Sequence, residues 1–241
     1  MKEILQLQDR LDFLNTQEAC RDSFMEYIRY IWPGFIEGEH HRVIAERLTA
    51  VAKGELKRLI INMPPRHTKS EFASIYFPSW MMGLQPNLKI MQTTHTADLS
   101  INFGRKVRNL MDTEEYTKIF QDVNLAADSK SAGKWQTSKG GEYFAAGVGG
   151  AIAGRGADLL IIDDPHSEQD AMSMNLLDSC YEWYTSGPRQ RLQPGGAIVI
   201  VMTRWSTMDL TGRLLTRQTE LNSDQWEVIE LPAIFEDTEE V

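Results

Sequence analysis

Short apolar runs alternate with segments of helical periodicity along most of this chain. Runs of four to eight apolar residues rich in β-branched side chains are typical of strands buried on both faces of a parallel sheet. The predicted strands span residues 58–63, 88–94, 141–147, 158–163, 197–203 and 226–231. Predicted helices lie at residues 69–82, 97–111, 170–184 and 208–217. The alternation predicts an α/β fold with a mainly parallel central sheet flanked by helices.

The first 50 residues do not follow this alternation. Their periodicity predicts two helices separated at Pro33 and Gly34, in the stretch IWPGF. We therefore predict a helical N-terminal extension at residues 1–50 and an α/β core at residues 51–235. The acidic residues 236–241 resemble the start of a linker.

Composition narrows the class of protein. The chain has 241 residues, a formal net charge of -9, and only two cysteines, Cys20 and Cys180. Two cysteines make no disulfide framework, and the apolar runs are too short to cross a bilayer. We expect a protein of the cytoplasm with no membrane partner. The negative charge argues against coating nucleic acid through bulk positive charge, so any such contact must be local.

A turn joins the first predicted strand to the next helix, in the stretch INMPPRHTKSE. Lys69 and Ser70 stand at the first helical positions, where free backbone N–H groups and the helix dipole attract a phosphate. The pattern G-x-x-x-x-G-K-[ST] is not met, because Thr68 precedes the lysine and no first glycine is present. Pro64 and Pro65 can make this loop rigid in place of glycines. The motif alone leaves two interpretations open, a phosphate-binding loop (P-loop) and an ordinary surface turn.

Two carboxylates favour the first interpretation. Asp163 and Asp164 end an apolar run in ADLLIIDDP, which places them at the carboxyl edge of the sheet, where ligands of α/β proteins bind. Asp163 is predicted to hold Mg²⁺ together with Ser70, and Asp164 to polarise an attacking water. Thr203 ends another strand and is the predicted sensor of a γ-phosphate. The structural alternative for the acids is a solvated turn at Pro165.

Two arginines are candidates for stabilising charge in a transition state. Arg155 lies in the glycine-rich stretch GVGGAIAGRGADLL, from which it could reach a phosphate of its own or of a neighbouring subunit. Arg66 lies within the loop itself and is the competing candidate in cis. The alternative for Arg155 is a solvated arginine on a flexible loop.

Further candidates concern the base of a nucleotide and nucleic acid. Trp32, Phe35 and His41 are the predicted contacts of an adenine ring, with core packing as the alternative. The predicted DNA contacts are Arg105, Lys106 and Arg108 on a helix and Arg189 and Arg191 in a loop, with a solvated face as the alternative. The full set of predicted nucleotide contacts is Pro65, Arg66, His67, Thr68, Lys69, Ser70, Thr203 and His41.

The stretches MPPRHTKSE, GVGGAIAGRGADLLIIDDP and VMTRWSTMDLTGRLL, in this order, closely resemble the large terminase subunit of tailed bacteriophages, specifically its N-terminal ATPase domain. In that family the loop commonly reads Pro-Pro-Arg-His-Gly-Lys-Ser, so the absent first glycine is a family trait and Thr68 is a departure. Many terminases also have Glu where this chain has Asp164, one methylene shorter.

The resemblance implies a P-loop NTPase of the additional-strand class, with ATP and Mg²⁺ as cofactors. It implies a motor that pumps double-stranded DNA into a procapsid in the cytoplasm of the infected bacterium. The implied partners are the portal protein, the small terminase subunit and further copies in a ring, although an isolated domain could be a monomer. No acidic cluster typical of the terminase nuclease follows Asp164, and we expect no DNA cleavage.

Rival functions remain. A GTPase would need Asn-Lys-x-Asp, which is absent, and a helicase of related fold would need a second motor domain. Another nucleic-acid-dependent P-loop ATPase is the nearer rival. A catalytically silent module that docks on a portal or small terminase is the alternative from a different class.

Overall fold

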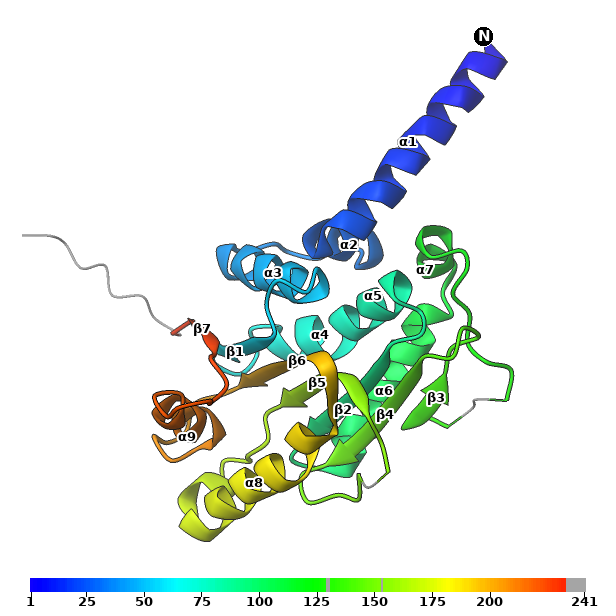
Figure 1. Cartoon of the computed structure of the whole chain (residues 1–241). Coiled ribbons are helices and arrows are strands. Elements are labelled where there is room, and N and C mark those ends of the chain that lie inside the picture. The colour runs from blue at the N-terminus through cyan, green and yellow to red at the C-terminus, as the bar shows by residue number, and fades with distance from the viewer. Residues whose placement is uncertain (129–130, 153, 233–241) are drawn as a thin grey trace, which may run out of the picture.

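The computed structural model describes residues 1–128, 131–152 and 154–232. A seven-stranded sheet forms its centre, with the spatial order β3-β4-β2-β5-β6-β1-β7 (Figure 1). The strands are β1 (Arg58–Asn62), β2 (Lys89–Thr94), β3 (Lys134–Gln136), β4 (Glu142–Gly147), β5 (Ala157–Asp163), β6 (Leu192–Met202) and β7 (Glu227–Glu230). The six strands predicted from the sequence are therefore all confirmed, and β3 is an addition.

The strand directions define the class of sheet. β3 pairs antiparallel with β4, and every other pairing in the sheet is parallel. β6 lies between β1, which leads into the Lys69 loop, and β5, which ends at Asp163. This inserted strand is the additional strand from which the class takes its name, so the predicted fold class is confirmed.

Helices cover both faces of the sheet because successive strand residues point to opposite sides. Leu159 and Ile161 of β5 pack in a larger core beneath the helices that precede β3, whereas Leu160 and Ile162 pack in a smaller core beneath α8 and α9. The helices are α1 (Lys2–Asp22), α2 (Phe24–Ile31), α3 (Glu39–Ala52), α4 (Lys69–Glu71), the π-helix η1 (Phe72–Tyr76), α5 (Phe77–Leu84), α6 (Ala97–Met111), α7 (Glu114–Ile119), the 3₁₀ turns η2 (Asp170–Met172) and η3 (Pro188–Arg191), α8 (Met174–Ser186) and α9 (Leu210–Arg217).

The N-terminal extension contains three helices, so the prediction of two was wrong. An extra break falls at Ser23, whose backbone is extended and whose side chain accepts a hydrogen bond from the Glu26 N–H at 3.4 Å. A serine caps a helix in this way and ends the preceding one. α1 projects from the body and is fixed at its end, where Arg21 donates to the Ile119 carbonyl (Figure 1).

The predicted boundary at residue 50 falls inside α3, which packs with α2 into the larger core. Residues 236–241, the predicted linker, lie outside the described residues.

β3 and α7 were missed because each is short, with three and six residues, too few to show a period. Within the described ranges, no helix combines the length and apolar character needed to cross a membrane.

Candidate functional site

The loop after β1 places Lys69 at the carboxyl edge of the sheet. Lys69 begins α4 and is buried, with 4% of its surface exposed. Its ammonium group donates to Thr203 Oγ1 at 2.8 Å and forms an ion pair with Asp164 Oδ2 at 2.9 Å. The ends of β1, β5 and β6 therefore converge on one cation, as parallel strands in neighbouring positions allow.

Asp163 is the buried acid of this cluster. Ser70 donates to its Oδ1 at 3.1 Å and Ser74 donates to its Oδ2 at 2.6 Å. Burial, and then the neighbouring charge of Asp164, raises the pKa of Asp163 to about 7. Both hydroxyl contacts favour the ionised form in return. With a pKa of about 7, this carboxyl group can release its proton when a cation binds.

The donors around Asp163 fit a magnesium ion. Mg²⁺ prefers oxygen ligands and keeps several waters when it binds beside phosphates, so one carboxylate and one hydroxyl from the protein suffice. Ser70 Oγ and Asp163 Oδ1 are such a pair. No group of three or more His, Cys, Asp or Glu side chains that could hold a metal ion occurs in the described parts of the chain.

Asp164 is fixed in an unusual backbone conformation, with φ 41°. Its N–H donates to the Val201 carbonyl at 2.8 Å, and its carbonyl accepts from the His95 N–H at 3.2 Å. Its side chain accepts from the Thr203 N–H at 2.7 Å. A non-glycine residue at positive φ persists only where its surroundings hold it, a condition met at many catalytic sites. Its carboxylate thereby faces Lys69 from a rigid support.

Thr68 also has positive φ, at 63°. For a β-branched residue the left-handed region costs about 1–2 kcal/mol, which explains why glycine is usual at this position of the motif. His41 Nε2 lies 2.6 Å from Thr68 Oγ1, and the Thr68 hydroxyl in turn lies 2.5 Å from the His67 carbonyl. Thr68 therefore lies in the left-handed region, which glycine adopts at no steric cost.

His41 belongs to an aromatic cluster that covers the helix after the loop. Its ring stacks on Phe72 at 5.0 Å and meets Phe35 edge-on at 4.8 Å, while Trp32 stacks on Tyr76 at 4.9 Å. Trp32 and Phe35 pack against the main core, as the alternative interpretation of these aromatics held.

His41 was predicted to contact a nucleotide base, and in the structure its ring contacts groups of the protein. The imidazole is buried, with 5% of its surface exposed, and both ring nitrogens already have partners in the protein. Burial, and then the neighbouring His40, lowers the pKa of His41 to about 4, so the ring is neutral near pH 7.

The two candidate arginines lie at opposite edges of the sheet. Arg155 precedes β5, whereas Asp163 ends it, and seven residues at about 3.3 Å each separate these edges by about 20 Å. Arg155 pairs with Glu142 at 2.9 Å and lies over the Phe144 ring at 4.0 Å. It cannot reach the Lys69 site of its own chain, which excludes the cis role considered for it. Arg66 is exposed in the loop next to Lys69, with φ 65°.

The predicted DNA contacts divide into two kinds. Arg105 and Lys106 on α6 are exposed. Arg189 is ion-paired with Asp224 at 2.8 Å, and Asp224 also pairs with Arg58 at 3.0 Å. Arg189 therefore has a structural partner inside the chain, and the stronger candidates for phosphate contact are the exposed cations of α6.

Two residues of the site escaped the sequence analysis. Ser74 was missed although it follows Ser70 by four positions, the spacing that places two side chains on one helical face. The π-helix η1 contains Ser74. His95 follows β2 directly, and a polar residue just after a parallel strand was the available signal.

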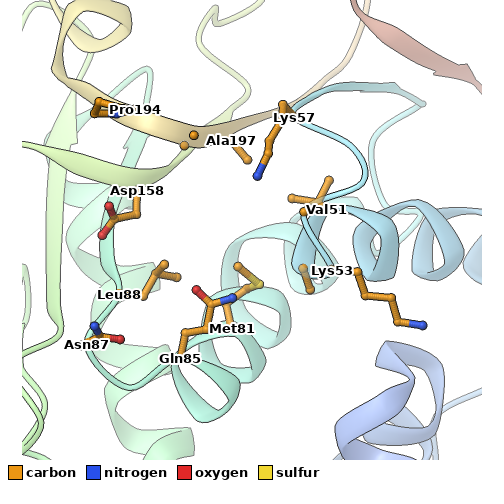
Figure 2. Close-up of a pocket in the computed structure, with 14 residues that line it drawn as sticks. Val51, Lys53, Lys57, Met81, Gln85, Asn87, Leu88, Asp158, Pro194 and Ala197 are labelled. Carbon is orange, nitrogen blue, oxygen red and sulfur yellow. The ribbon is translucent and has the colours of Figure 1, made fainter.

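A cavity lies at each end of the sheet. One, of about 500 Å³, adjoins the loop and is lined by Pro64, Pro65, Thr203 and Leu231 among others. Another, of about 330 Å³, lies at the opposite end, where Figure 2 shows Lys57 and Asp158 around it. Of the residues that the sequence analysis assigned to phosphate and metal, Pro65 and Thr203 line the first cavity, and none lines the second.

Comparison with known proteins adds a likeness of fold. No family model matches this sequence, and no curated protein matches it significantly. Among solved structures, the crystal structure of the HK97 bacteriophage large terminase matches with a TM-score of 0.52 at 10% sequence identity. The match covers 81% of this chain and 39% of that chain. The likeness is one of fold, and this chain spans well under half of that protein.

Proposed function

We propose that this chain is the ATP-hydrolysing motor domain of a phage large terminase, which drives double-stranded DNA into a procapsid. The observation that carries the proposal is the convergence of Lys69, Ser70, Asp163, Asp164 and Thr203 at the carboxyl edge of an additional-strand sheet. The fold shared with the HK97 large terminase supports the choice of this family of motors over other P-loop ATPases.

The contacts suggest what each residue does with ATP. Lys69 exchanges Asp164 for the β- and γ-phosphates, and the backbone N–H groups of the loop and helix start hold the remaining phosphate oxygens. Ser70 and Asp163 would hold a magnesium ion, which would supply positive charge beside those oxygens. The 500 Å³ cavity beside Pro64 and Pro65 offers space for the nucleoside.

Release of Lys69 leaves Asp164 free to orient the attacking water. Thr203 is bonded to both partners of the ion pair, through its hydroxyl to Lys69 and through its N–H to Asp164. In the proposed complex, Thr203 contacts both the γ-phosphate bound by Lys69 and the general base Asp164. Release of the phosphate changes the contacts of Thr203. Such a change at the end of β6 would couple hydrolysis to movement.

The proposed partners follow from the same role. Double-stranded DNA would meet exposed cations such as Arg105 and Lys106 through its phosphates, because a motor must position DNA without reading bases. A portal protein, a small terminase subunit and further copies of this chain in a ring complete the proposed assembly, in the cytoplasm of an infected bacterium.

Displacement of a triplex-forming oligonucleotide from double-stranded DNA tests the motor directly. We expect displacement that requires ATP and Mg²⁺ and stops with a non-hydrolysable analogue. ATP hydrolysis without any displacement, at protein concentrations that allow ring assembly, would instead favour another nucleic-acid-dependent ATPase. Portal binding without hydrolysis would favour the silent docking module.

The arginine that stabilises the transition state is proposed to be Arg66. It shares the loop with Lys69 and is exposed, whereas Arg155 is occupied by Glu142 and Phe144 at the far edge. We expect Arg66→Ala to lower kcat about 10³-fold, the lower end of values for an arginine finger. Arg155→Ala is expected to leave kcat within a few-fold and to lower the free energy of unfolding by about 1 kcal/mol, through loss of a half-buried pair.

The steady-state kcat for ATP hydrolysis, measured for both variants and the wild-type protein, decides which arginine stabilises the transition state. Circular dichroism on thermal unfolding checks that each variant is folded. A large loss of kcat in Arg155→Ala alone would assign the finger to a residue that acts on a neighbouring copy.

A further inference from the structure

The proposed phosphate-binding loop contains Thr68, a β-branched residue in a backbone conformation that such residues disfavour. Thr68 occupies the left-handed conformation, with φ 63° and ψ 10°, directly before Lys69. The N–H of Phe72 donates to the Thr68 carbonyl at 3.0 Å, so the same residue also begins the helix on which phosphate binding depends. Relaxation of Thr68 to an ordinary conformation would rotate these backbone groups away from a phosphate.

A chain of hydrogen bonds from α3 opposes this relaxation. The Gly38 N–H donates to His41 Nδ1 at 2.9 Å, which fixes the proton of the neutral ring on Nε2. That Nε2–H points at Thr68 Oγ1, 2.6 Å away, and the Thr68 hydroxyl completes the chain by donating to the His67 carbonyl at 2.5 Å. Each donor in this series of three hydrogen bonds has one acceptor.

The aromatic cluster holds the imidazole in this orientation. Phe72 stacks on one side of the ring, and Phe35 contacts it edge-on. Because the ring is buried and wedged between these residues, it cannot turn away without disturbing the core. Glycine at position 68 would need none of these contacts, since it adopts positive φ at no steric cost.

We infer that His41 is a positioning residue that holds Thr68 in the left-handed conformation and so substitutes for the missing P-loop glycine. This inference rests on the proposed function, because the conformation in question is the one that presents Lys69 and the helix start to a phosphate. Both ring nitrogens of His41 are bonded to groups of the protein. Its effect on ATP passes entirely through Thr68.

A double-mutant cycle between His41→Ala and Thr68→Gly tests the inference. In the wild-type background, we expect His41→Ala to weaken the binding of Mg²⁺-ATP about tenfold, measured with a fluorescent ATP analogue, since a left-handed threonine is disfavoured by about that factor. In the Thr68→Gly background, the same substitution should change affinity less than twofold. His41→Gln, which keeps a side-chain N–H donor near the position of Nε2, should retain most of the affinity.

Thermal unfolding of the same proteins without nucleotide gives an independent cycle. His41→Ala should lower Tm by about 3 °C more in the wild-type background than in the Thr68→Gly background. Equal losses in both backgrounds, in binding and in Tm, would overturn the inference and leave His41 as a core residue. If no protein binds ATP while the Tm cycle shows coupling, the proposed function fails and the positioning role stands.

Discussion

Lys69→Ala is expected to abolish ATP hydrolysis, with kcat/KM lower by at least about 10³-fold. Lys69 is the buried cation on which Asp164 and Thr203 converge, and it is placed to neutralise the β- and γ-phosphates. Loss of one charged group that acts on the transition state in a site of low dielectric costs about 10²–10³ in kcat alone. Weaker ATP binding adds to this, because the same charge also contacts the ground state.

Lys57→Ala is the matched control for this variant. Lys57 precedes β1, whereas Lys69 follows it, and Lys57 lines the cavity at the opposite end of the sheet (Figure 2). Initial rates of phosphate release, together with the Kd for Mg²⁺-ATP, should leave Lys57→Ala near wild type. Retention of more than a tenth of wild-type kcat/KM by Lys69→Ala would remove this lysine from the mechanism.

Asp164→Asn is expected to separate binding from chemistry. The asparagine oxygen can still accept from the Thr203 N–H, so the backbone around residue 164 should keep its conformation. The amide cannot act as a base for the attacking water, and we expect kcat to fall by about 10²–10⁴-fold, the range for general base catalysis. ATP should bind several-fold more tightly, because Lys69 no longer has to leave an ion pair before it meets phosphate.

Single-turnover hydrolysis and equilibrium binding measure the two effects on the same preparation. Asp158→Asn is the matched control, since Asp158 lies in β5 near the opposite end of the same strand and accepts a hydrogen bond from the Lys89 N–H at 2.8 Å. Weaker ATP binding by Asp164→Asn, with hydrolysis unchanged, would show that the carboxylate orients Lys69 and has no part in the chemistry.

The fold was predictable where apolar runs were long. β1, β5 and the second half of β6 are buried on both faces, and each appears in the sequence as a continuous run of apolar residues. The short edge strand β3 carries no such run, because its residues alternate between exposed and buried positions. The break at Ser23 was missed although Ser23 and Glu26 form the S-x-x-E pattern that marks the start of a helix.

The positions of site residues at strand ends could be predicted from the sequence. Contacts between residues far apart in the sequence could not. Lys69, Asp163 and Thr203 could be placed at one edge of the sheet because each lies at the end of, or just beyond, its own strand. The contact of His41 with Thr68 joins residues 27 positions apart, and a pattern in a single sequence gives no pairing of that kind. Arg155 was placed on a glycine-rich loop correctly, but the side of the sheet on which that loop lies depends on the direction of β5.

The rate of Mg²⁺-dependent ATP hydrolysis by the wild-type chain, measured against protein concentration in the presence of double-stranded DNA, tests the central claim most directly. We expect saturable hydrolysis that is lost in EDTA, rises per molecule with protein concentration and increases with DNA. Absence of hydrolysis at every concentration, or the same rate in Lys69→Ala, would contradict the assignment of this cluster as the site of an ATP-driven motor.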